Sequence, residues 1–183
     1  MVSPAIFMPP GLEKQPEVEQ PTPITPGPTG WWAYFQTQRD LYMAPQIYDW
    51  TCSIASTTWV LQATGLDPNA SRERIAYQIG YPQCVNEAYG LMDTNCVERV
   101  FKSYLVGATT LWPSFDQMFE LAQQTTGILN STRWYHFVAV RGVSGSNIWV
   151  ANSAQGYKGI YELVSRGQWD AWAGSWKTVL LEH

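Results

Sequence analysis

The sequence predicts an α+β fold in two layers, with helices from the first part of the chain packed on an antiparallel sheet from the second part. The prediction rests on the spacing of the apolar residues. Up to about residue 124 they recur at helical spacing, whereas from Gly127 onward they alternate or form short runs between turn residues, as strands do. No internal repeat is visible, and 183 residues are enough for one domain with a full core.

The helical part divides at its capping residues. Asp49 or Thr51 is expected to cap a helix that begins near Cys52, and Gly65 is expected to end it. Ser114-Phe115-Asp116-Gln117 has the spacing of a capping box for a later helix. Helices are expected over residues 31–42, 52–63, 71–79, 94–105 and 114–124.

The sheet part contains one clear hairpin. Ser144-Gly145-Ser146-Asn147 predicts a turn between two strands, because small and flexible residues favour tight reversals. Strands are expected over residues 127–129, 135–142, 148–152, 160–163 and 176–180, with a short helix over 165–172.

Both ends of the chain are expected to lie outside the domain, which we place at residues 30–180. Residues 1–29 hold most of the prolines and almost no hydrophobic periodicity, which is typical of an extended, semi-rigid linker. A linker here implies an upstream domain in a longer protein. The alternative is a tail that wraps this domain, with Ile6, Phe7 and Met8 docked on it. We interpret residues 181–183 as the remnant of a purification tag.

Composition excludes several classes of function. Charged residues are only 14% of the chain, the net charge is −4 and no basic run is present, so nucleic acid is not an expected partner. No apolar stretch approaches the roughly 20 residues that span a bilayer, and no secretory signal pattern is visible. The ten Trp and ten Tyr indicate either a contact surface or a largely aromatic core.

The sequence allows two states for Cys84 and Cys96. Cys84 and Cys96 stand twelve residues apart, so they either form a disulfide that closes a loop or remain reduced and half-buried. Cys52 is free in both cases.

Four residues, Gln46, Cys52, His136 and Asn152, have the chemistry of a thiol-based acyl-transfer site. Cys52 would be the nucleophile, His136 would hold its proton, Asn152 would orient the imidazole, and Gln46 would bind the oxyanion. The start of a helix and a nearby His136 are both expected to lower the pKa of the Cys52 thiol. Such chemistry needs no cofactor, and the chain offers no close ligand pairs for a metal.

Each of these residues also has an ordinary structural interpretation. Cys52 is compatible with a small core side chain, and His136 with a core position on its strand. Asn152 is compatible with a turn residue, and Gln46 with a solvent-facing loop amide.

The surroundings of Cys52 and His136 resemble papain-like cysteine peptidases. Gln46 stands six residues before Cys52, Cys52-Ser53-Ile54-Ala55 starts the nucleophile helix, and Tyr135-His136-Phe137 opens a strand. Within that group the chain is most similar to peptidases that process bacteriocin leaders. Two features depart from these relatives: Asn152-Ser153 replaces their Asp-Pro and is nearer to papain, and the segment 81–113 matches no pattern of the family.

The resemblance implies a papain-like fold and a cysteine peptidase or amidase that forms an acyl-thioester on Cys52. By analogy, the substrate would be a peptide, such as a peptidoglycan stem, and the chain a module of a larger bacterial or phage protein, extracellular or virion-associated. Leader-peptide processing and transamidation are alternatives. A further alternative is a catalytically silent binding or structural module.

Overall fold

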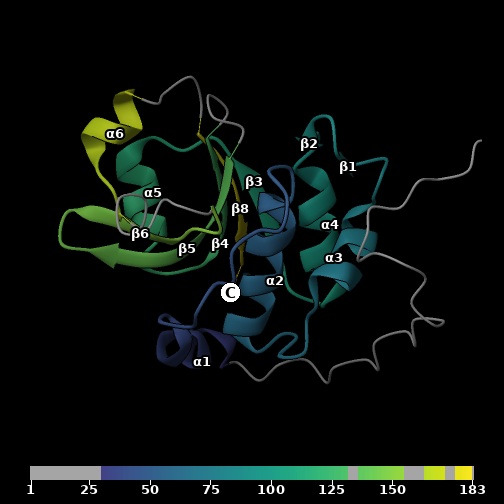
Figure 1. Cartoon of the computed structure of the whole chain (residues 1–183). Coiled ribbons are helices and arrows are strands. Elements are labelled where there is room, and N and C mark those ends of the chain that lie inside the picture. Colours follow the sequence, from purple (N-terminus) through teal and green to yellow (C-terminus); the bar gives the residue numbers. More distant parts are fainter. Residues whose placement is uncertain (1–29, 132–135, 155–162, 172–175, 183) are drawn as a thin grey trace, which may run out of the picture.

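The computed structural model describes residues 30–131, 136–154, 163–171 and 176–182, and Figure 1 shows their arrangement. The helices are α1 (Trp31–Gln38), α2 (Cys52–Thr64), α3 (Arg72–Ile79), α4 (Asn95–Ser103), α5 (Phe115–Leu121) and α6 (Arg166–Ala171). The strands are β1 (Val85–Asn86), β2 (Gly90–Leu91), β3 (Ala108–Leu111), β4 (Gly127–Ser131), β5 (His136–Ser144), β6 (Asn147–Ala151), β7 (Leu163–Val164) and β8 (Trp176–Leu181).

The main sheet is antiparallel and has the strand order β3-β8-β4-β5-β6-β7. β5 and β6 form the predicted hairpin, with Ser144 opposite Asn147 and a register shift between Val140 and Gly142. β1 and β2 form a separate two-stranded hairpin. The α+β prediction is therefore confirmed.

The two faces of the sheet contact different helices, as Figure 1 shows. Phe137, Ala139 and Val179 point to the face that α2 covers, and they share a core with residues of α1, α3 and α4. Val138 and Val140 point to the other face, where they share a second core with residues of α5 and α6. The predicted helical layer is present, and α5 and α6 add helices on the opposite face.

Helix α2 is the central helix, and Gln62 is its only residue that is not buried. It ends as predicted, because Gly65 adopts the left-handed conformation with φ 69° that favours glycine. Its start differs from the prediction. Thr51 is the N-cap residue, but its side chain makes no capping hydrogen bond to the helix and its hydroxyl donates to the Tyr48 carbonyl at 2.7 Å.

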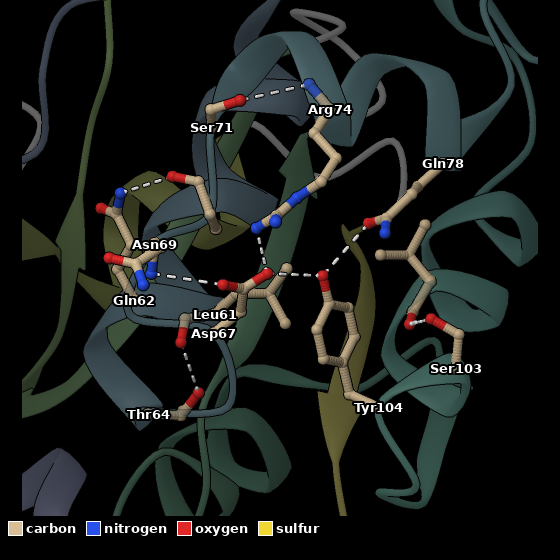
Figure 2. Close-up of polar contacts among 12 residues, drawn as sticks. Leu61, Gln62, Thr64, Asp67, Asn69, Ser71, Arg74, Gln78, Ser103 and Tyr104 are labelled. Carbon is tan, nitrogen blue, oxygen red and sulfur yellow. Dashed lines mark hydrogen bonds and ion pairs between the residues drawn. The ribbon is translucent and has the colours of Figure 1, made fainter. Parts of the chain in front are cut away.

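The loop after α2 is tied to α3 and α4 through one buried carboxylate. Figure 2 shows Arg74 and Tyr104 converging on Asp67. The Tyr104 hydroxyl donates to Asp67 at 2.8 Å, and burial together with this carboxylate raises the pKa of Tyr104 to about 12. Asp67 also accepts the Asn69 backbone amide, so it stabilises the turn after α2 as well as pairing with Arg74.

The predicted capping box is present, and α3 has local caps at both ends. Ser114 and Gln117 form a reciprocal capping box at the start of α5. Ser71 accepts the Arg74 amide at the start of α3, and Gly80 ends that helix in the left-handed region. α1 is shorter than the predicted helix 31–42 and ends at Gln38.

The segment 81–113 contains features that the sequence did not predict. β1, β2 and β3 all lie within it. Cys84 and Cys96 are joined by a disulfide, which decides the open alternative. Because Cys96 lies in α4, the bond ties the β1–β2 hairpin to that helix.

The last strand continues past the predicted domain end at residue 180. Leu181 is buried, pairs with Ala108 of β3 and donates its amide to the Thr126 carbonyl at 2.9 Å. The Glu182 amide donates to the Gly107 carbonyl at 2.8 Å. Both residues therefore contribute to the fold, because the sheet needs their backbone groups.

Several predictions concern positions outside the described residues. These are the segment 1–29, residue 135 at the start of the predicted strand 135–142, most of the predicted strand 160–163, residue 172, and residue 183 of the expected tag remnant. Of that predicted strand, only Leu163 is described, and it begins β7.

Candidate functional site

Cys52 is the first residue of α2, as predicted, and its side chain is only 3% exposed. Its thiol is hydrogen-bonded with the backbone of Phe137, the residue that follows His136 on β5. One turn further along α2, the Ser56 hydroxyl donates to the Phe137 carbonyl at 3.1 Å. The fold therefore brings the start of α2 against the start of β5.

His136 and Asn152 are in direct contact. His136 opens β5, Asn152 follows the last residue of β6, and the two strands are neighbours in the sheet. The His136 Nε2 atom lies 2.8 Å from Asn152 Oδ1. Because Asn152 Oδ1 also accepts the Ala154 amide at 3.0 Å, it is an acceptor, and Nε2 carries the proton. The other ring nitrogen, Nδ1, is left with its lone pair.

The ring of His136 lies at the end of the sheet. Alternation along β5 directs Phe137 toward α2 and Val138 toward the opposite face. Cys52 meets the strand at the Phe137 backbone, one residue from His136. From the residue order and the family resemblance, we expect Cys52 Sγ to lie within roughly 3 to 5 Å of a ring nitrogen of His136.

Burial dominates the electrostatics of both groups. It raises the pKa of the Cys52 thiol, and hydrogen bonds with the backbone of Phe137, Ser53 and Cys52 only oppose this shift. It lowers the pKa of His136, while the hydrogen bond to Asn152 acts in the raising direction. The expected lowering of the Cys52 pKa was therefore wrong, because desolvation of a nearly enclosed thiolate outweighs the helix terminus.

Gln46 is buried rather than solvent-facing, at 6% exposure. Its Nε2 donates to the Tyr48 carbonyl at 3.0 Å and to the Asp49 carbonyl at 3.1 Å. Its Oε1 accepts the Ser153 hydroxyl at 3.0 Å, and its backbone amide donates to the Ser153 carbonyl at 2.7 Å. Both amide hydrogens are thus used within the loop before Cys52, and an oxyanion would have to take one of them.

Ser153 is the site residue that sequence reasoning missed. It is 1% exposed, follows Asn152 and joins that strand end to the loop that carries Gln46. A serine after an asparagine gives no signal of its own, because the contact spans 107 residues of sequence.

A separate pocket of about 220 Å³ lies on another side of α2 and includes none of the four predicted residues. Its lining residues are Tyr42, Met43, Ala44, Ala55, Thr58, Trp59, Gln62, Ala70 and Arg72. Within the described ranges, no three His, Cys, Asp or Glu side chains gather in a way that would hold a metal ion. The described helices are too short or too polar to cross a bilayer.

Most of the described Trp side chains are core or partly covered, and Trp112 is the one among them that is largely exposed, at 57%. In the part of the chain that the structure describes, the Trp residues therefore serve packing more than a contact surface, whereas Tyr34, Tyr42, Tyr77 and Tyr89 are exposed.

Comparison with known proteins gives matches among solved structures. No protein-family model matches the chain, and no curated protein does. Among solved structures, the chain resembles a double glycine motif protease from an AMS/PCAT transporter, solved in complex with a leader peptide, at a TM-score of 0.56. The identity is 16%, and the match covers 76% of this chain and 91% of the other. The chain therefore has the papain-like fold, and the resemblance to leader-processing peptidases holds at the level of the fold.

Proposed function

We propose that this protein is a cysteine hydrolase that cleaves a peptide or amide bond through an acyl-thioester on Cys52. The observation that carries the proposal is the contact between His136 Nε2 and Asn152 Oδ1. Cys52, which takes no part in the disulfide, supports it from the start of α2. The contact between His136 and Asn152 leaves Nδ1 as the ring atom able to accept a proton.

The reaction begins with transfer of the Cys52 proton to His136 Nδ1 as sulfur attacks the carbonyl carbon of the substrate. The carbonyl oxygen becomes an oxyanion, which the Cys52 amide at the start of α2 can stabilise. The imidazolium then donates its proton to the leaving amine, and the carbon–nitrogen bond breaks. Water attacks the thioester with His136 as base and releases a carboxylic acid and the free thiol.

The directions of the two pKa shifts describe the resting site. A raised pKa for Cys52 and a lowered pKa for His136 favour a neutral thiol beside a neutral imidazole at neutral pH. Proton transfer then accompanies attack on the substrate instead of preceding it. Asn152 contributes by stabilising the imidazolium that forms during the reaction.

The substrate class is a peptide. A peptidoglycan stem peptide would suit a module linked by residues 1–29 to an upstream domain, outside the cell or on a virion. A leader peptide is the alternative, which the leader peptide bound to the structurally similar protease favours. Asn152-Ser153 in place of Asp-Pro distinguishes this chain from the leader-processing peptidases that its sequence resembles, and this difference bears on the substrate more than on the reaction.

The test compares the parent chain with Cys52→Ala and with Trp112→Ala, a matched surface variant. Each is incubated with purified peptidoglycan and with a peptide that contains a double glycine, and the fragments are identified by mass spectrometry. We expect cleavage by the parent and Trp112→Ala and none by Cys52→Ala. Cleavage that persists in Cys52→Ala would refute the thioester mechanism.

A silent binding or structural module is the second candidate, and the 3% exposure of Cys52 favours it. A thiol probe separates the two. Labelling of Cys52 by an electrophilic peptide that mimics an acyl donor indicates a working site, whereas resistance to every such peptide, with iodoacetamide labelling only after unfolding, indicates a silent one.

A further inference from the structure

The turn that presents Cys52, residues 46–51, is held from within by hydrogen bonds; we call it the nucleophile turn. The Tyr48 carbonyl accepts the Thr51 hydroxyl at 2.7 Å and the Thr51 amide at 3.0 Å. The Gln46 side-chain amide donates to the same Tyr48 carbonyl and to the Asp49 carbonyl. These bonds close the turn directly before α2.

Trp50 is held by aromatic stacking with one residue of the turn and with one residue outside it. Its ring stacks on Tyr48 with centroids 5.8 Å apart and planes 3° apart. It also stacks on Tyr81, which lies outside the turn, with centroids 5.5 Å apart and planes 22° apart. Trp50 stands two residues before Cys52, so these contacts act close to the sulfur.

The β1–β2 hairpin completes the contact with Trp50. The Tyr81 hydroxyl donates to Glu87 in the hairpin at 3.0 Å. Gly90 of β2 has φ +64°, and its backbone lies so close that a Cβ there would be 3.5 Å from the Trp50 carbonyl oxygen. The Cys84–Cys96 disulfide joins the foot of this hairpin to α4.

We propose that the disulfide-closed hairpin is a brace that holds the nucleophile turn through Trp50, and that Trp50 is a positioning residue for Cys52. The brace depends on the oxidised state. A dithiol reductant would convert the Cys84–Cys96 bond to two thiols and become a disulfide itself. The hairpin would then lose its covalent tie to α4, and the turn would open. The catalytic consequence rests on the proposed function, whereas the opening of the turn does not.

The first measurement follows the Cys52 thiol alone. Iodoacetamide labels the parent, Trp50→Ala, Trp50→Phe and Cys84→Ser/Cys96→Ser variants, and mass spectrometry gives the rate at Cys52. Cys52 is 3% exposed in the closed turn, so opening should speed its labelling. We expect Trp50→Ala and the disulfide variant to label about tenfold faster than the parent, because stacking contacts or their anchor are lost. Trp50→Phe keeps a ring and should label like the parent.

Local opening is separated from unfolding by repeating the labelling in low urea. Only labelling through global unfolding accelerates steeply with denaturant, so a flat dependence supports the brace. If Trp50→Ala does not fold, Tyr81→Ala replaces it, since it removes one stack and leaves the turn residues intact. Parent-like labelling of Cys84→Ser/Cys96→Ser, or of the stacking variant, overturns the proposal.

The second measurement is turnover of an amide substrate. We expect kcat to fall by about 10- to 100-fold in Trp50→Ala with a smaller change in KM, and to recover in Trp50→Phe, because misplacing a reacting group costs rate more than binding. A change confined to KM would contradict a positioning role. If the parent hydrolyses no substrate while the labelling pattern holds, the proposed function fails and the brace stands.

Discussion

Replacing Asn152 should move the basicity of His136 in opposite directions, depending on the new side chain. Asn152→Ala removes the hydrogen bond to Nε2 at 2.8 Å, which acts to raise the His136 pKa. Asn152→Asp puts a carboxylate in the same place. The first variant should lower the His136 pKa further, and the second should raise it above that of the parent.

The structure gives the relative size of these effects. A single hydrogen bond contributes about 1 kcal/mol. A carboxylate about 4 Å from an imidazolium contributes about 4 kcal/mol at an effective dielectric constant near 20, before its own desolvation is subtracted. The increase in Asn152→Asp should therefore exceed the decrease in Asn152→Ala.

The assay is an NMR titration of the imidazole protons. The chain has two histidines, so His183→Gln leaves His136 as the only titrating ring. The same variants should show the acid limb of kcat/KM moving with the NMR midpoint, downward in pH for Asn152→Ala and upward for Asn152→Asp. Equal midpoints in all three proteins would refute the assigned contact, and an unmoved acid limb would separate His136 from the chemistry.

The remaining predictions concern the thiol, the oxyanion residue, acid stability and the first segment. Because burial raises the pKa of Cys52, its labelling by iodoacetamide should need a higher pH than labelling of free cysteine. Mass spectrometry should show labelling of Cys84 and Cys96 only after reduction of their disulfide. Gln46→Ala should slow turnover by about 10² to 10³. It should also lower Tm, because the Gln46 side chain is hydrogen-bonded to Ser153, Tyr48 and Asp49. An unchanged Tm in calorimetry would argue against these contacts. The pKa of His136 is lowered in the folded state, so its contribution to stability is complete above the unfolded pKa of about 6.5 and is lost as pH falls through the folded pKa. In His136→Gln, the free energy of unfolding measured in urea should therefore depend less on pH over this range. A chain that begins at Gly30 should keep its Tm, and a large loss would show that residues 1–29 pack on the domain.

The order of elements follows from local sequence signals. Gly65 and the Ser114–Gln117 capping box act within a few residues of themselves, so their effects could be predicted without the fold. The change from helical to alternating spacing likewise placed α2, β5, β6 and β8 close to their observed ranges.

Long-range pairing could not be predicted in the same way. β3 is a short strand whose partner, β8, lies some seventy residues away, for example Ala108 opposite Leu181. The disulfide was left open because a spacing of twelve residues allows a bond without requiring one. Both depend on how distant segments meet.

The sequence by itself determined which residues were candidates for the site. Cys52 and His136 are scarce residue types in a distinctive order, and the contact between His136 and Asn152 was predicted from that order and is observed. The tertiary structure decided their environment. Enclosure of Cys52 at 3% exposure reverses the expected direction of its pKa shift, and Ser153 engages the amide of Gln46. The physical reason is that desolvation and hydrogen-bond competition depend on every atom packed around a group, and those atoms come from segments that are distant in the sequence.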